Sequence, residues 1–299
     1  MFLPLEIPFP RIDPAAFTVP FLEFPVRWYA LGYIFGLVLG WWYAVRITRS
    51  ARVWGADEKG PLQRTDIDDF AFYAMIGILV GGRLGYILFY TLPFEPQKLQ
   101  ADLTFIFRMW EGGMSFHGGL IGAVGAVFIT AWLRKIPVLS LGDVACAAAP
   151  IGIFLVRIAN FINGELYGRP TDVPWAMRFP DYNWATRSWG SVEGKPLVHP
   201  SQIYEAALEG VLLFAVCWFA VWKLRLLRKP GMVAGIFLIG YAIARTISEQ
   251  FREPDNFTQG VMPEWFTMGM LLSMFMVAGG GFLIWWANRN NGPGAAKAA

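Results

Sequence analysis

Residues 141–161 have the sequence LGDVACAAAPIGIFLVRIANF, in which 144–156 form an almost uninterrupted apolar run. A helix that crosses a bilayer needs about 20 predominantly apolar residues, so this stretch is long enough to span a membrane. Asp143, Arg157 and Asn160 make it the least hydrophobic of the candidate spans, and a helix of a soluble protein is the alternative interpretation. The length of the apolar run favours the membrane.

Six further stretches have the same character, and together they predict an all-α integral membrane protein with seven transmembrane helices. The predicted spans are 26–46, 69–91, 116–134, 141–161, 202–223, 232–251 and 264–286. Composition agrees, since 56% of the residues are hydrophobic and only 16% are charged, against roughly 45–50% and 25% in soluble proteins. We expect a single membrane domain over residues 1–299. The net charge of +3 does not suggest nucleic-acid binding.

The distribution of basic residues predicts the orientation of these spans. Thirteen lysines and arginines fall on the side of the 46–66 and 223–229 loops, and nine on the other side. Because cytoplasmic loops carry the excess of basic residues, the N-terminus is expected outside and the C-terminus inside. Residues 162–200 are then expected to form a small periplasmic cap of short strands or turns between spans 4 and 5. Residues 288–299 are expected to be a disordered cytoplasmic tail, because they lack apolar content.

Polar residues in the spans gather toward one face of the membrane. Ionisable groups at membrane depth are costly and are therefore functional candidates. With the predicted topology, one set of polar residues lies toward the outer ends of the spans, and Asp143 lies at the inner face. This set comprises Tyr29, Arg83, His117, Arg157, Asn160, Asn163, Glu165, His199, Gln202, Tyr204, Glu205, Arg245, Glu249 and Arg252. The convergence predicts a polar site that opens to the outer leaflet.

The spacing of the arginines indicates what this site binds. Arg245, Glu249 and Arg252 share one helix face at i, i+4 and i+7. Arginine stays charged when buried and binds phosphate through two parallel hydrogen bonds, which favours a phospholipid headgroup as ligand. His117 lies in the glycine-rich stretch EGGMSFHGG (111–119) at a predicted helix N-terminus, where it is a candidate general base. The structural alternatives are an Arg83–Glu249 ion pair and a histidine that merely packs at the interface.

Three other classes of protein remain as alternatives. An anion transporter is expected to show internal repeats and polar residues at the midplane of the membrane, whereas this chain shows no repeat and a polar set near one face. A membrane acyltransferase with an H-x4-D motif is disfavoured, because Gly122 stands five residues after His117. A receptor or structural seven-helix protein leaves the outer arginines unexplained.

Several motifs, taken together and in order, resemble one family. Residues 157–169 (RIANFINGELYGR) are similar to the signature R-x-G/A-N-F-x-N-x-E-x-x-G of the prolipoprotein diacylglyceryl transferases, with Ala159 where glycine is more usual. HGGLIG (117–122), HPSQIYE (199–205, with Ile203 for leucine) and RTISEQFREPD (245–255, with Ser248 for an apolar residue) match three further motifs. Trp28-Tyr29 and Gly82-Arg83 also fit.

The resemblance implies an enzyme of the bacterial inner membrane. Such an enzyme transfers the diacylglyceryl group of phosphatidylglycerol to the lipobox cysteine thiol of a preprolipoprotein and releases glycerol-1-phosphate, the first step of lipoprotein maturation. The resemblance implies no metal and no cofactor. Among the matching residues we expect His117, Arg157, Arg245 and Glu249 to be catalytic. We expect substrate to be bound by Arg157, Asn160, Asn163, Glu165, Gly168, Tyr29, Arg83, His199, Gln202, Tyr204, Glu205 and Arg252.

Overall fold

The structure is a computed structural model that describes residues 7–21, 23–55, 60–109, 112–253 and 267–290. These residues include seven helices long and apolar enough to span a membrane, which confirms the predicted all-α membrane fold. They are Trp28–Thr48, Arg64–Phe94, Phe116–Arg134, Val138–Ile162, Ser201–Trp222, Met232–Glu249 and Met268–Asn290. The chain divides into two compact units, Met1–Gly40 with Cys146–Ala299, and Trp41–Ala145, each of which is described by itself.

The unit Trp41–Ala145 is built around two long helices. After α2 (Ala51–Trp54), helix α3 (Arg64–Tyr86) continues through the π-helical turn η1 (Ile87–Thr91) into α4 (Leu92–Phe94). The short helices α5 (Gln97–Ala101) and η2 (Leu103–Phe107) lead to α6 (Phe116–Arg134), whose bounds match the predicted span. The span from α3 to α4 is longer than the predicted 69–91 at both ends: residues 64–68, mostly polar, form its first turn, and α4 extends it to Phe94.

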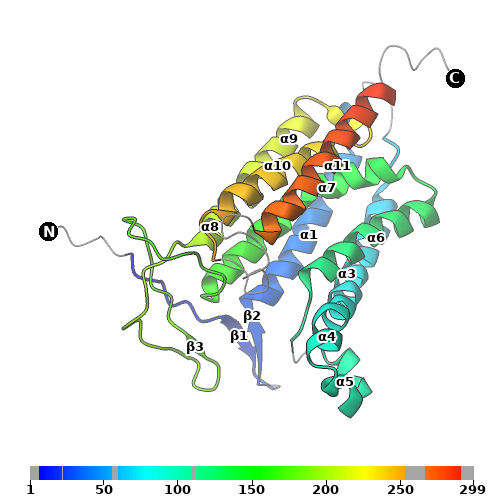
Figure 1. The fold of residues 1–299 in the computed structure, drawn as a ribbon. Coiled ribbons are helices and arrows are strands. Elements are labelled where there is room, and N and C mark those ends of the chain that lie inside the picture. Colours follow the sequence, from blue (N-terminus) through cyan, green and yellow to red (C-terminus); the bar gives the residue numbers. More distant parts are fainter. Residues whose placement is uncertain (1–6, 22, 56–59, 110–111, 254–266, 291–299) are drawn as a thin grey trace. The chain divides into compact units, whose positions relative to one another are not determined.

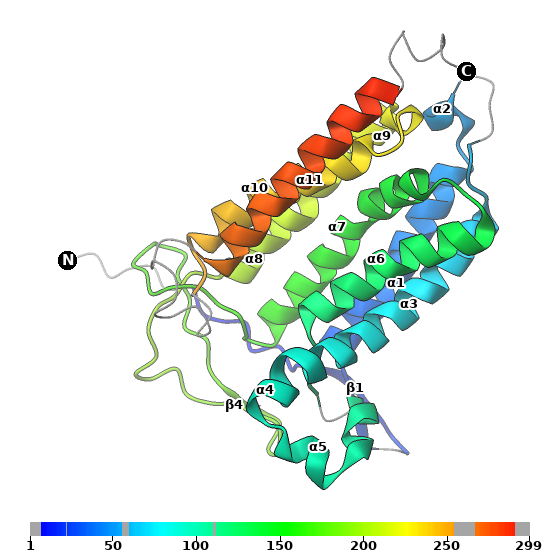
Figure 2. The ribbon, with the colours of Figure 1, turned by 45° about the vertical axis from the view of Figure 1, so that its right-hand side comes forward.

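Helices α3 and α6 lie side by side and antiparallel (Figure 2). Their contact is made by glycines, since a Cβ atom at Gly122 would overlap the backbone carbonyl of Gly77 and one at Gly85 would lie 2.7 Å from Cα of Gly118. Small residues four apart allow membrane helices to approach this closely. Near the other end, Nε of Arg134 donates to Oδ1 of buried Asp66 at 2.9 Å.

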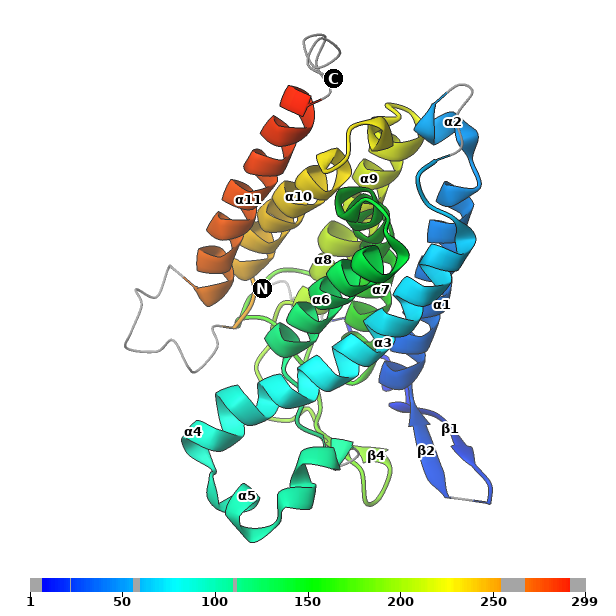
Figure 3. The same cartoon turned by 90° about the vertical axis from the view of Figure 1, so that its right-hand side faces the viewer.

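The other unit begins with a β-hairpin that leads directly into a spanning helix. Strands β1 (Ala15–Val19) and β2 (Phe24–Arg27) pair antiparallel, and α1 (Trp28–Thr48) starts at the next residue (Figure 3). Helix α1 packs on α7 (Val138–Ile162) within this unit through Gly36, whose added Cβ would lie 3.0 Å from Cα of Gly152. Gly32 approaches Leu155 in the same way one turn earlier. The backbone of α7 is thereby fixed one turn before Arg157.

The remaining spans of this unit form a group of adjacent helices. The fifth span consists of α8 (Ser201–Glu205), the π-helical η4 (Ala206–Leu212) and α9 (Leu213–Trp222). After η5 (Leu226–Arg228), α10 (Met232–Glu249) packs against both α9 and α11 (Met268–Asn290), as Figure 1 shows. Helix α11 extends to Asn290 and takes in the first three residues of the predicted tail. Residues 291–299 lie outside the described part of the chain.

The segment between α7 and α8 contains two short strands. Strands β3 (Tyr182–Asn183) and β4 (Ser188–Trp189) form a small hairpin, and Val198 bridges to Pro170 and Met177. Its apolar centre is Phe179 and Val198, and Phe9 from the N-terminal segment completes it. The sequence did not predict this partner, because no local pattern links residue 9 to residue 179.

Candidate functional site

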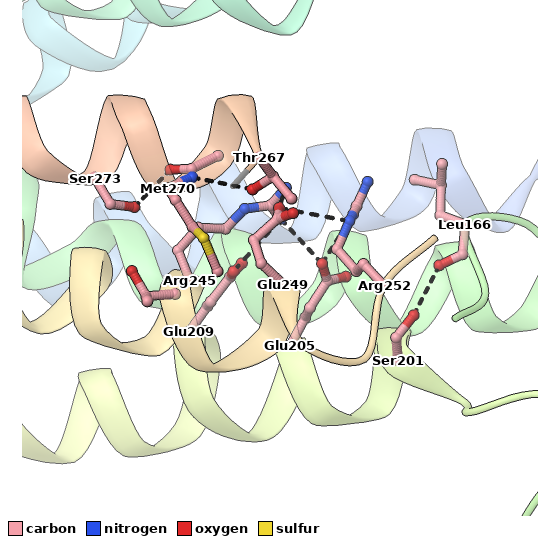
Figure 4. Close-up of polar contacts among 12 residues, drawn as sticks. Leu166, Ser201, Glu205, Glu209, Arg245, Glu249, Arg252, Thr267, Met270 and Ser273 are labelled. Carbon is pink, nitrogen blue, oxygen red and sulfur yellow. Dashed lines mark hydrogen bonds and ion pairs between the residues drawn. The ribbon is translucent and has the colours of Figure 1, made fainter. Parts of the chain in front are cut away.

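One buried carboxylate gathers three arginines. Glu205, at the end of α8, is fully buried. Its Oε1 lies 3.0 Å from Nη1 of Arg245 on α10 and 2.9 Å from Nη1 of Arg252, just after α10. Its Oε2 lies 3.3 Å from Nη1 of Arg157 on α7. Figure 4 shows Arg245 and Arg252 pointing at the same carboxylate. Two segments distant in sequence, at residue 157 and at residues 245–252, thus place guanidinium groups around one carboxylate of a third.

Two more glutamates complete this ionic cluster. Oε2 of fully buried Glu209 lies 3.2 Å from Nη2 of Arg157, and its Oε1 lies 3.7 Å from Nη1 of Arg245. Glu249 pairs with Nη2 of Arg245, and its Oε1 lies 3.8 Å from Nε of Arg252. We call these six residues the Arg–Glu cluster. Three positive and three negative charges balance formally, as buried charges require.

Local helix geometry explains why these side chains meet. Glu205 and Glu209 are four residues apart on the α8–η4 segment, as are Arg245 and Glu249 on α10, so each pair shares a face. Glu209 lies within the π-helical turns of η4, a distortion that is frequent at functional sites. Gly269 of α11 leaves room for the cluster, because an added Cβ would lie 3.1 Å from Nε of Arg245 and would crowd Glu249.

The turn after α7 joins several of the predicted binding residues. Oε1 of Glu165 accepts hydrogen bonds from Nδ2 of Asn160 at 2.8 Å and Nδ2 of Asn163 at 3.2 Å. Nε2 of Gln202 donates to the backbone carbonyl of Glu165 at 2.6 Å. This amide–carboxylate group lies at the end of the helix that carries Arg157, so it continues the polar surface beyond the Arg–Glu cluster.

Gly168 ties this turn to the end of α10. Its N–H donates to the carbonyl of His199 at 2.8 Å, and Gly168 forms a β-bridge with Arg252. A Cβ atom at Gly168 would overlap the carbonyl oxygen of Phe251 and lie 2.9 Å from Cβ of His199. Nε of Arg169 also donates to the carbonyl of Arg252 at 2.6 Å. The backbone at Arg252 is therefore held from the 168–169 turn.

His199 and Tyr204 form a separate hydrogen-bonded group. Nδ1 of His199 lies 3.2 Å from the hydroxyl of Tyr204, which accepts from Nε1 of Trp175 at 2.6 Å. Burial lowers the pKa of His199, so its neutral form is favoured. Tyr29, at the start of α1, has its hydroxyl 3.2 Å from that of Tyr33.

Two predicted site residues belong to the Trp41–Ala145 unit. Arg83 is buried and donates to four backbone carbonyls, at 3.0 Å to Ile106, 2.7 Å to Gly112, 3.1 Å to Gly113, and also to Phe105. These bonds favour a structural role for Arg83 in holding the loop before α6. His117 is exposed in the first turn of α6, whose N-cap Ser115 accepts from the Gly118 N–H at 3.3 Å.

Sequence reasoning missed Glu209 and Gly269. Glu209 interrupts the apolar run 206–221 and is an ionisable residue within a span, which is the signal that could have found it. Gly269 carries no such signal, because only the packing of α11 brings it near Arg245. Among the described residues, no group of histidine, cysteine and carboxylate side chains has an arrangement that would hold a metal ion.

Fold and site together define a class of protein: a multi-pass membrane protein with a buried arginine–carboxylate cluster. A model of the prolipoprotein diacylglyceryl transferase family matches residues 14–286. The chain is 47% identical over 292 residues to the phosphatidylglycerol–prolipoprotein diacylglyceryl transferase of Bradyrhizobium diazoefficiens, covering 97% of this chain and 96% of the relative. It is 46% identical over 301 residues to the Rhodopseudomonas palustris protein of the same name, covering 98% and 96%. The chain belongs to the prolipoprotein diacylglyceryl transferase family, which confirms the resemblance.

Proposed function

We propose that this chain catalyses the first step of bacterial lipoprotein maturation. It transfers the diacylglyceryl group of phosphatidylglycerol to the cysteine thiol in the lipobox of a prolipoprotein, at the Arg–Glu cluster. Two observations support the proposal: three guanidinium groups converge on buried Glu205, and relatives that match nearly the whole chain carry this activity in their names.

Arg157 and Arg245 are the proposed phosphate ligands. Their side chains are 15% exposed, so each is largely desolvated yet reachable. A preorganised guanidinium in a site of low dielectric stabilises charge that develops in the transition state. Asn160, Asn163 and Tyr29 are proposed to bind oxygens of the headgroup. The 168–169 turn and the 162–200 segment are proposed to shape the entrance for substrate.

The transfer breaks one bond and forms another. The cysteine sulfur attacks the carbon of the diacylglyceryl group that bears the phosphate, so a C–S bond forms, the C–O bond breaks, and glycerol-1-phosphate leaves. A free cysteine has a pKa near 8.5, so removal of the thiol proton accelerates the attack. His117 is the proposed base for that proton. Glu249 is proposed to orient Arg245, with which it pairs.

The proposed location is the bacterial inner membrane, with the N-terminus periplasmic and the C-terminus cytoplasmic. The excess of basic residues in the 46–66 and 223–229 loops supports this orientation. In intact cells, a membrane-impermeant thiol reagent is expected to label Ser191→Cys but not Lys229→Cys. Labelling of Lys229→Cys alone would reverse the proposed topology.

A mass assay tests the activity. Purified protein is mixed with phosphatidylglycerol vesicles and a lipobox peptide, and peptide mass and released glycerol phosphate are measured. We expect a diacylglyceryl mass gain with wild type and with Arg289→Ala, an arginine at the end of α11. No gain is expected with Arg157→Ala, or when the peptide carries serine in place of cysteine. Folded wild-type protein that gives no mass gain would refute the proposed function.

A further inference from the structure

Glu209 is the member of the Arg–Glu cluster that the sequence motifs leave out, yet it contacts both proposed phosphate ligands. It is fully buried near the middle of the fifth span. Its Oε2 accepts from Nη2 of Arg157 at 3.2 Å, and its Oε1 lies 3.7 Å from Nη1 of Arg245. Glu205 contacts the same two arginines, at 3.3 Å and 3.0 Å, but also pairs with Arg252. The ion pairs of Glu209 within the described residues are with Arg157 and Arg245, the two residues proposed to hold phosphate.

The bonding of Glu209 is incomplete. Its Oε1 is buried and accepts no hydrogen bond from the described residues. A buried acceptor without a donor is costly, and such atoms in a native structure call for an explanation. Gly210, the next residue, packs closely against α7, because an added Cβ would lie 2.7 Å from Cβ of Phe154. The backbone therefore holds the carboxylate of Glu209 in place, while its Oε1 accepts no hydrogen bond from the described residues.

The charge balance of the Arg–Glu cluster determines how Glu209 affects the binding of an anion. The cluster holds three arginines and three glutamates, so it is formally neutral before an anion arrives. A phosphodiester brings a further negative charge, which competes with the carboxylates for the same guanidinium groups. Glu209 lies 3.7 Å from Nη1 of Arg245, against 3.0 Å for Glu205, so its contact to that arginine is the one most easily exchanged for phosphate.

We infer that Glu209 is a positioning residue for the phospholipid phosphate. It holds Arg157 and Arg245 beside one carboxylate before lipid binds, and it weakens ground-state binding by competing for them. This inference rests on the proposed function. Such an arrangement directs binding energy to the transition state rather than to the bound substrate.

The test compares Glu209→Gln with Glu209→Asp. Glutamine keeps the size but removes the charge, so Arg157 and Arg245 gain a net positive charge without a fixed separation. We expect at least a fivefold lower Kd for phosphatidylglycerol in nanodiscs, together with at least a tenfold lower kcat. Aspartate keeps the charge and is expected to return the Kd to within twofold of wild type. Ser248→Ala, a buried hydroxyl on α10 without a hydrogen-bond partner among the described residues, is the control and should leave both constants unchanged.

A merely structural role gives a different result. In that case both Glu209 variants lose activity in proportion to the folded fraction, measured by size-exclusion chromatography, while the Kd of the folded protein stays at the wild-type value. That outcome, or a weaker affinity of Glu209→Gln for phosphatidylglycerol, would overturn the inference. Since the Kd is measured without turnover, a wild-type protein that binds lipid but transfers nothing would refute the proposed function and not the role of Glu209.

Discussion

Oε1 of Glu205 lies 2.9 Å from Nη1 of Arg252, although the two residues are 47 positions apart in the sequence. The same oxygen lies 3.0 Å from Nη1 of Arg245. A single buried oxygen atom therefore sets the separation of two guanidinium groups. The stability of this region and the geometry of the site depend on the same contact.

Glu205→Gln is expected to destabilise the protein. The change leaves three buried arginines with two carboxylates, and breaking a buried ion pair by removing one partner costs about 3–5 kcal/mol. Glu205 contacts all three arginines, so its loss is expected to lower the thermal unfolding midpoint in detergent more than Glu209→Gln does. Glu193→Gln, an exposed position in the 162–200 segment, serves as control. An unchanged midpoint in Glu205→Gln would contradict the structural importance of the cluster.

Gly168→Ala is expected to impair transfer while the protein stays folded. The added methyl group overlaps the carbonyl of Phe251 and crowds His199, so the bridge between Gly168 and Arg252 must shift. Misplacement of a site by about 1 Å lowers rates by up to about 100-fold. Initial transfer rates measure the effect. The added Cβ of Gly281→Ala on α11 meets no atom within 4 Å, so this control should retain activity. Equal transfer rates for the two variants would show that the bridge between Gly168 and Arg252 does not position the site.

Gly122→Ala is expected to weaken the contact between α3 and α6. Its Cβ would overlap the backbone of Gly77, which has no flexible end that can move aside. Overpacking of this kind costs about 1–3 kcal/mol. Gly125→Ala on the same helix meets nothing within 4 Å and is expected to leave the unfolding midpoint unchanged or slightly higher. Thermal unfolding of both variants tests this prediction. A midpoint for Gly122→Ala at or above that of Gly125→Ala would contradict the close packing of Gly122 against Gly77.

His199 predicts a loss of stability on acidification. Burial lowers its pKa in the folded state below the usual value of about 6.5, so the unfolded chain binds a proton first. Its contribution is fully present above pH 6.5 and is lost as the pH falls through the folded-state value. His199→Gln should therefore show a smaller drop in unfolding midpoint between pH 7.5 and 5 than wild type. If the unfolding midpoints of the two proteins fall by the same amount over this pH range, the predicted contribution of His199 is wrong.

Much of the fold followed from the sequence because membrane spans are local features. The length of an apolar run is sufficient to predict a span, and the seven predicted runs correspond to the seven spanning helices. Their ends differ by a few residues where polar first turns extend a helix, as at Arg64. The candidate residues also followed from local patterns, since spacing alone puts Arg245 and Glu249 on one face.

Partner choice did not follow from the sequence. The sequence left open a pairing of Arg83 with Glu249, whereas Arg83 donates to backbone carbonyls of the loop that follows α5. Glu209 lies inside the fifth span and outside the motifs of the resemblance, whereas the predicted site residues lie toward the outer ends of their spans. No pattern in one segment indicates which residue of another segment its side chain will meet.

The sequence by itself determined that this chain spans a membrane, which residues are candidates for its site, and which family it resembles. These depend on apolar length, helical periodicity and short motifs, all of which are read within one segment. Only the tertiary structure decided that Glu205 is shared by three arginines and that Glu209 bridges two of them. These contacts join residues 36 to 52 positions apart, and their geometry is fixed by glycine-mediated helix packing, such as that of Gly210 against Phe154.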